Sequence, residues 1–91
     1  MQYIAVHINL FSLKQPIYLI KDNEPMLIGA VSINDIDSAA AGLCKKYNAQ
    51  NIKLFGEEKY IKNIGKKIIN FAKQNYSIEN LIVEVNDEIL N

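Results

Sequence analysis

The chain has 91 residues, 49% of them hydrophobic and 22% charged, which is typical of one folded domain covering residues 1–91. Its ten basic residues are all lysine and balance ten acidic residues, so no overall field draws the chain to nucleic acid or to an anionic membrane. Short apolar runs, the absence of signal-peptide features and a single cysteine, Cys44, predict a cytoplasmic protein that does not enter membranes.

Three strand-like runs come first, over residues 2–13, 16–21 and 26–32, with a polar turn at residues 21–25. They predict an antiparallel meander. In the first run, apolar residues lie on both faces near the start, a pattern typical of a strand in the centre of its sheet. One face carries Ile4, Val6, Ile8 and Leu10, and the other carries Tyr3, Ala5, His7 and Asn9.

Helical and strand periods then alternate. Residues 33–47 predict a helix with Cys44 on its apolar stripe, ended by Asn48, and residues 58–76 predict a second, amphipathic helix. Strands are predicted at 51–55 and 80–86, and strands joined through helices pair in parallel by right-handed crossovers. The expected fold is therefore α/β, with a five-stranded mixed sheet in the order 3-2-1-4-5 and two packed helices. Its exposed edges are expected at the third and fifth strands.

The second helix has two opposed faces. Its expected apolar face carries Tyr60, Ile61, Ile64, Ile68, Phe71 and Ala72, and its expected basic face carries Lys59, Lys62, Lys66 and Lys73. The lysines predict either a surface that contacts an anion or an acidic partner, or a solvated face whose charge is balanced by nearby acids. Zero net charge and the lack of arginine favour the solvated face.

The order β-β-β-α-β-α-β resembles the ribonuclease H-like superfamily over nearly the whole chain. The resemblance implies that topology and, for the nucleases of the superfamily, two metal ions held by acids at set places on the sheet. The positions that correspond on this chain are His7 or Asn9 on the first strand, Asp35 and Asp37 on the first helix, Glu57 and Glu58 after the fourth strand, and Glu84 with Asp87 and Glu88, the last two on an expected short tail. The first-strand acid is missing, which argues against a nuclease.

The actin-like ATPases of the same superfamily bind phosphate with an acid-and-glycine loop between the first two strands. Here that link, residues 11–16, contains no glycine, and the four glycines at 29, 42, 56 and 65 are isolated. Nucleophilic catalysis also lacks support, because Cys44 lies on an apolar stripe and His7 is the only histidine. We therefore expect no catalytic residue, no metal site and no cofactor.

The sequence favours a non-catalytic module that binds a protein partner or itself. Its bias toward lysine, isoleucine and asparagine is typical of an AT-rich genome, and small single-domain chains of this kind are common in viruses and mobile elements. Self-association is expected through an edge strand or through a helix flank such as Ile69 and Tyr76. Two alternatives are a nucleic-acid-associated accessory protein that uses the lysine face, with weak binding, and a reduced ribonuclease H-like nuclease.

Overall fold

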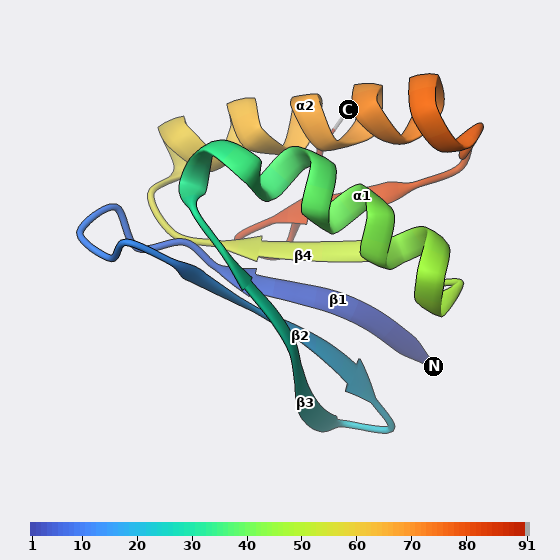
Figure 1. The fold of residues 1–91 in the computed structure, drawn as a ribbon, viewed down its shortest axis with the longest axis horizontal. Helices are drawn as coiled ribbons and strands as arrows, with labels where there is room; N and C mark the ends of the chain where they lie inside the picture. The colour runs from blue at the N-terminus through green and yellow to red at the C-terminus, as the bar shows by residue number, and fades with distance from the viewer. Residues whose placement is uncertain (91) are drawn as a thin grey trace.

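The computed structural model describes residues 1–90 (Figure 1). In chain order its elements are β1 (Gln2–His7), β2 (Gln15–Lys21), β3 (Glu24–Val31), a single 3-10 turn (Ile33–Asp35), α1 (Ile36–Tyr47), β4 (Asn51–Phe55), α2 (Glu58–Tyr76), β5 (Ile82–Val85) and β6 (Glu88–Ile89). The strands form one mixed sheet in the order β3-β2-β1-β4-β5-β6. β1 pairs with β2 antiparallel and with β4 parallel, and β4 pairs with β5 in parallel. This is the predicted α/β sheet with ribonuclease H-like topology, extended by one strand.

The additional strand corrects the prediction at the carboxyl end. Asp87 and Glu88 do not lie on a tail, because the chain reverses at Asn86 and Asp87, whose φ angles are 49° and 69°. Two successive residues with positive φ are typical of the two-residue hairpin turn whose twist matches that of the flanking strands. Glu88 and Ile89 therefore pair with β5, and β6 rather than β5 is the edge of the sheet.

β1 is shorter than predicted. The strand ends at His7 rather than at residue 13, because its pairing with β2 ends at Val6 and its pairing with β4 ends at Phe55. The last bond of that ladder is donated by the Ile8 N–H to the Phe55 carbonyl, at 2.8 Å. Residues 9–14 form a loop, so Leu10 lies outside the core and is 39% exposed.

Both helices lie on the same side of the sheet (Figure 1). The apolar stripe of α1 is buried at Ile36, Ala40 and Cys44, and the left-handed Asn48, at φ 54°, ends that helix as predicted. The core between helices and sheet includes Ile4, Val6, Ile17, Ile52, Leu54, Ile61, Ile68 and Val83, all fully buried. Within residues 1–90, no helix combines the length and the apolar character needed to cross a membrane.

A tight link joins β4 to α2 at Gly56. Its φ of 149° disfavours any side chain, and a Cβ there would lie 2.7 Å from the Ile8 carbonyl oxygen. The Asn86 amide holds the same link, since it donates to the Gly56 carbonyl at 3.0 Å and accepts from the Gly56 N–H at 3.2 Å. The ends of β1, β4 and β5 are thus fixed relative to one another.

Candidate functional site

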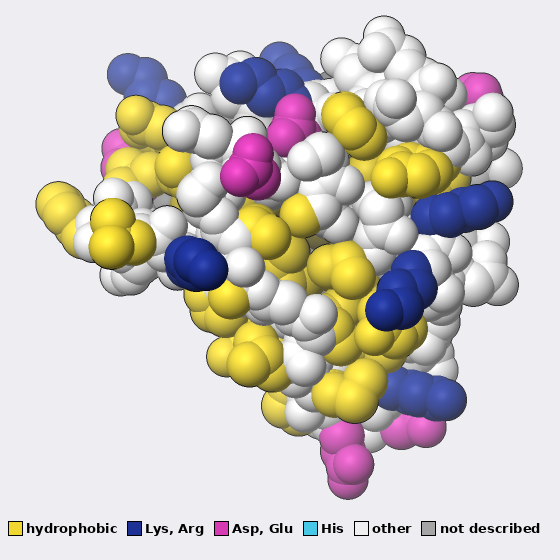
Figure 2. Space-filling model, viewed as in Figure 1, with side chains coloured by type: hydrophobic (Ala, Val, Ile, Leu, Met, Phe, Trp, Pro, Cys, Tyr) yellow, Lys and Arg dark blue, Asp and Glu magenta, His cyan; other side chains and the backbone are white. Residues whose placement is uncertain are grey.

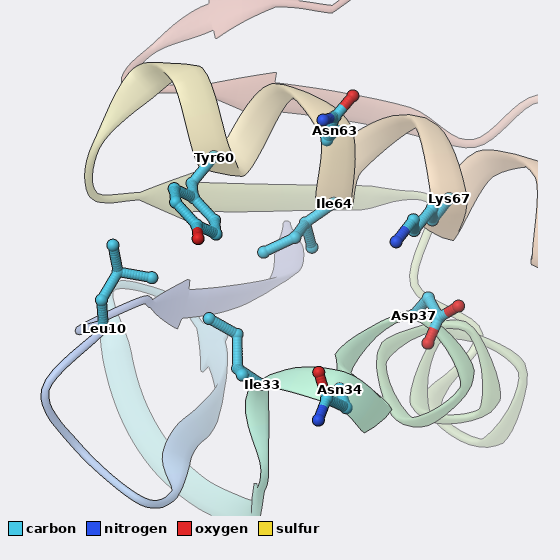
Figure 3. Close-up of a pocket in the computed structure, with 8 residues that line it drawn as sticks. All are labelled: Leu10, Ile33, Asn34, Asp37, Tyr60, Asn63, Ile64 and Lys67. Atoms are coloured by element: carbon cyan, nitrogen blue, oxygen red, sulfur yellow. The ribbon is translucent and has the colours of Figure 1, made fainter.

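The parallel strands β1 and β4 have their carboxyl ends at the same end of the sheet. Open α/β sheets bind ligands in the crevice beyond the carboxyl ends of their strands. Here this end of the sheet is bordered by the β1–β2 loop, by the 3-10 turn with the start of α1, and by the first half of α2 (Figure 3). These segments enclose a cleft of about 380 Å³. It is lined by Leu10, Ile33, Asn34, Asp37, Tyr60, Asn63, Ile64 and Lys67.

The cleft has an apolar part and a polar part (Figure 3). Leu10, Ile33 and Ile64 converge between the loop, α1 and α2, whereas Asp37 and Lys67 lie opposite one another at the far end. The Asp37 Oδ1 accepts a hydrogen bond from the Ser38 N–H at 2.9 Å. The volume is near the lower end of the range for small-molecule sites. A small ligand with one charged end fits this lining, but the lining contains a single carboxylate and neither histidine nor cysteine.

Tyr60 is placed differently from the sequence prediction. The residue was expected on the apolar face of α2, yet its side chain is 53% exposed. The reason is that Tyr60 lies in the first turn of α2, next to the β1–β2 loop rather than above a strand. It separates the cleft from a second hollow of about 220 Å³, lined by Ile8, Asn9, Leu10, Phe11, Glu57 and Tyr60.

The β1–β2 loop is held from inside by a buried glutamine. Gln15 is fully buried, and its Oε1 accepts from the Asn9 N–H at 2.7 Å. Its Nε2 donates to the carbonyl oxygens of Asn9, at 2.8 Å, and Ser12, at 3.1 Å. The Asn9 side chain also accepts from the Phe11 N–H at 3.0 Å. The loop backbone is therefore ordered by side-chain bonds that replace strand pairing.

The same loop presents apolar side chains to solvent. Phe11 is 98% exposed and Leu13 is 93% exposed. Figure 2 shows hydrophobic side chains projecting from the body of the molecule at the left, where Figure 1 places this loop. The sequence does not predict this feature, because its alternating pattern allows a strand that continues through residue 13. Asn9 and Ser12, which favour turns, are the signal that could have ended the strand earlier.

The acids that the ribonuclease H-like resemblance singled out do not converge. Glu58 pairs with Lys62 at 3.5 Å, Glu57 precedes α2 and lines the second hollow, and His7 stacks on Phe55 with ring centroids 4.8 Å apart. Among residues 1–90, no three side chains of the His, Cys, Asp or Glu type form a group that could hold a metal ion.

Cys44 is buried in α1, where it is 1% exposed. Desolvation by burial raises the pKa of the Cys44 thiol to about 12. Since the thiolate is the nucleophilic form, this cysteine is a packing residue at neutral pH.

The four predicted contact lysines, Lys59, Lys62, Lys66 and Lys73, are all exposed on α2. Lys62 is paired with Glu58, and Lys62 and Lys66 line a hollow that also contains Glu88. Acidic side chains therefore accompany two of the four lysines. Exposed pairs of this kind weaken the local positive field without adding much stability.

No protein-family model matches the chain, and no curated protein matches it in sequence. Two solved structures with similar arrangements are the Aquifex aeolicus member of the Ppx/GppA protein family and the Aquifex aeolicus PPX-GPPA enzyme, at 17% and 16% identity. The alignments cover 93% of this chain in both cases, with TM-scores of 0.39 and 0.36. The chain spans about a third of the length of these structures, at 34% and 35%. The fold assignment rests on the strand order and directions described above.

Proposed function

We propose that the chain is a non-catalytic protein-binding module of the cytoplasm, and that it contacts its partner through the β1–β2 loop. The observation that carries the proposal is the pairing of a buried brace, Gln15, with two nearly fully exposed apolar side chains, Phe11 and Leu13. A free, buried Cys44 is in keeping with a reducing compartment.

The β1–β2 loop is ordered before it meets a partner. Binding energy is lost when a loop must be ordered on association, and a loop that is already ordered avoids that loss. Three hydrogen bonds from Gln15 hold this loop in the free protein. Burial of Phe11 and Leu13 in a partner would then contribute about 1.5–3 kcal/mol each. Buried aromatic anchors near the centre of an interface are where binding energy concentrates, which favours Phe11 as the main contact.

The partner that fits is a protein with an apolar pocket. The hollow beside the loop is lined by Ile8, Leu10, Phe11 and Tyr60, with Asn9 and Glu57 at its polar side. An interface centred on the loop would therefore have an apolar middle and a polar margin, which is the usual arrangement of protein–protein contacts. A membrane is a poorer match, because Lys14 is the single cation in the loop and anionic lipid surfaces attract clusters of basic residues.

The test compares three immobilised proteins in a pull-down from native lysate: the wild type, the double variant Phe11→Ser/Leu13→Ser, and Met26→Ser. Met26 is a matched control because it is 52% exposed on β3, away from the loop. We expect a protein retained by the wild type and by Met26→Ser but lost from the double variant.

Circular dichroism establishes that all three proteins are folded. Retention of the same proteins by the double variant would refute the role of the loop. The wild type is also incubated with anionic and neutral vesicles. If the wild type sediments with vesicles and the double variant does not, the loop binds membranes, and the proposal is overturned.

A further inference from the structure

A second surface, independent of the loop, is the face of the sheet opposite the helices. We call this face the open face, and the strand registers determine which side chains lie on it. From β3 to β6 it comprises Pro25, Leu27 and Ala30; Pro16, Tyr18 and Ile20; Tyr3, Ala5 and His7; Asn51, Lys53 and Phe55; Ile82 and Glu84; and Ile89. No helix within residues 1–90 covers it (Figure 1).

The composition of the open face is not that of a solvated sheet. A sheet with one face in water normally alternates apolar and polar residues, whereas parallel strands are normally covered on both faces. Here Tyr18, Ile20 and Leu27 occupy the outward positions of β2 and β3, and Leu27 is 61% exposed. The parallel strands β4 and β5 add Phe55 and Ile82, the latter 44% exposed. The sequence pattern is that of strands buried on both faces, but the helices α1 and α2 cover only one face of the sheet among residues 1–90.

We propose that a second copy of the chain packs on the open face, sheet against sheet, about a two-fold axis. The charges support this occupant. The open face carries one lysine and one glutamate, Lys53 and Glu84, which are register partners on neighbouring strands. In a two-fold contact, residue i of one copy meets residue j of the other and the reverse, so a surface that carries one charge of each sign is complementary to itself.

The local contacts leave these charges available. The Lys53 ammonium lies over the Tyr3 ring, 4.6 Å from its centroid. The ion pairs found within residues 1–90 join the amino terminus to Asp22 and Lys62 to Glu58, so Glu84 has no ion-pair partner among the described residues. A cation of a second copy would provide one. A nucleic acid does not fit, because the open face is electrically neutral.

The size of the open face agrees with a weak dimer. The six strands contain 32 residues. At about 3.3 Å per residue and about 4.8 Å between strands, they give a flat area of about 500 Å² before the relief of the side chains is added. Specific interfaces begin at about 600 Å² of accessible surface per partner. The aromatic residues Tyr3, Tyr18 and Phe55 are of the kind enriched in interface cores. We therefore expect association in the micromolar range.

The test is sedimentation equilibrium from about 1 µM to about 1 mM, a range that spans weak dimerisation. It is applied to the wild type, Lys53→Glu, Glu84→Lys, the double exchange, Leu27→Asp and the control Lys62→Glu, which makes the same change of charge on α2. We expect a wild-type dimer that each single exchange and Leu27→Asp weaken at least tenfold. The double exchange restores it, because opposite charges again meet across the axis, and Lys62→Glu leaves it unchanged.

Thermal unfolding monitored by circular dichroism at low concentration separates folding from association. A wild-type monomer throughout the range would overturn the proposal and leave the open face to a different protein. A wild-type dimer that is insensitive to both Leu27→Asp and Lys53→Glu would place the contact elsewhere and would also overturn it. Neither result bears on the loop, since the pull-down with Phe11→Ser/Leu13→Ser tests that surface separately.

Discussion

Replacement of Gln15 gives the sharpest test of how the β1–β2 loop is held. The Gln15 amide makes three hydrogen bonds to the backbone of Asn9 and Ser12, and the side chain is fully buried. Gln15→Leu removes all three bonds and replaces the amide with an apolar side chain of similar volume. At about 0.5–1.5 kcal/mol for each of the three bonds, the expected loss of unfolding free energy is about 1.5–4.5 kcal/mol. Because Asn9 is exposed and water can reach part of the freed backbone, we expect a value near 2 kcal/mol.

Gln15→Glu keeps the shape but replaces a donor with an acid. When protonated, the introduced carboxyl can accept from the Asn9 N–H and donate its proton to a loop carbonyl. When ionised, it is buried and faces the carbonyl oxygens of Asn9 and Ser12, which accept hydrogen bonds and do not donate them. Both burial and this missing donor raise the pKa of the introduced carboxyl above its unfolded value of about 4.3.

The sign of the pH dependence follows from linkage. A carboxyl whose pKa is higher in the folded state binds more protons there, so the unfolding free energy falls as pH rises from about 4.3 through the folded pKa. Buried carboxyls commonly have a pKa raised by about 2–3, which corresponds to about 3–4 kcal/mol of unfolding free energy lost on ionisation. We therefore expect Gln15→Glu to lie within about 1 kcal/mol of the wild type at pH 4 and to lose about 3 kcal/mol at pH 8.

Urea denaturation followed by circular dichroism measures these differences, each taken against the wild type at the same pH. Gln15→Leu is the matched control, because its difference from the wild type has no titrating group and stays constant with pH. A difference between Gln15→Glu and the wild type that is equal at pH 4 and pH 8 would refute the assignment of the amide nitrogen to the two carbonyl oxygens.

The remaining predictions concern Cys44 and the lysine face. Burial raises the pKa of the Cys44 thiol to about 12, so at pH 8 a disulfide reagent should label the folded protein far more slowly than the protein in urea; equal rates would contradict the burial. Lys62 and Lys66 lie near Glu58 and Glu88, so the wild type should show little affinity for duplex or single-stranded nucleic acid near physiological salt. Submicromolar binding there, lost in Lys62→Glu/Lys66→Glu, would favour the nucleic-acid alternative.

Much of the fold follows from short-range patterns that the sequence contains. The sequence predicts α2 with the same bounds, 58–76, that the structure has, because one 19-residue segment carries both an apolar and a charged face. Asn48 ends α1 as expected, since asparagine adopts the left-handed conformation more readily than most residues. The strand order 3-2-1-4-5 follows from the antiparallel meander of the first three strands and from a first strand that is apolar on both faces, which places a parallel strand beside it.

The loop is a feature that the tertiary structure decided. Residues 2–13 alternate in a way that allows a long strand, but β1 ends at His7, where its pairing with β2 has ended at Val6 and its pairing with β4 ends at Phe55. Gln15 then satisfies the freed groups of Asn9, through contacts that no local pattern encodes. As a result Phe11 projects into solvent instead of forming part of a strand.

The open face shows the same division. The sequence alone determines that β1 and β2 carry apolar residues on both faces, because every position is apolar over residues 3–6 and 16–20 and successive side chains of a strand point to opposite faces. Only the tertiary structure decides which face the chain itself covers. Both crossover helices pack on one side of the sheet, since right-handed connections that progress in one direction along a sheet place their helices on the same side. The apolar residues of the other face remain uncovered within residues 1–90 for that geometrical reason.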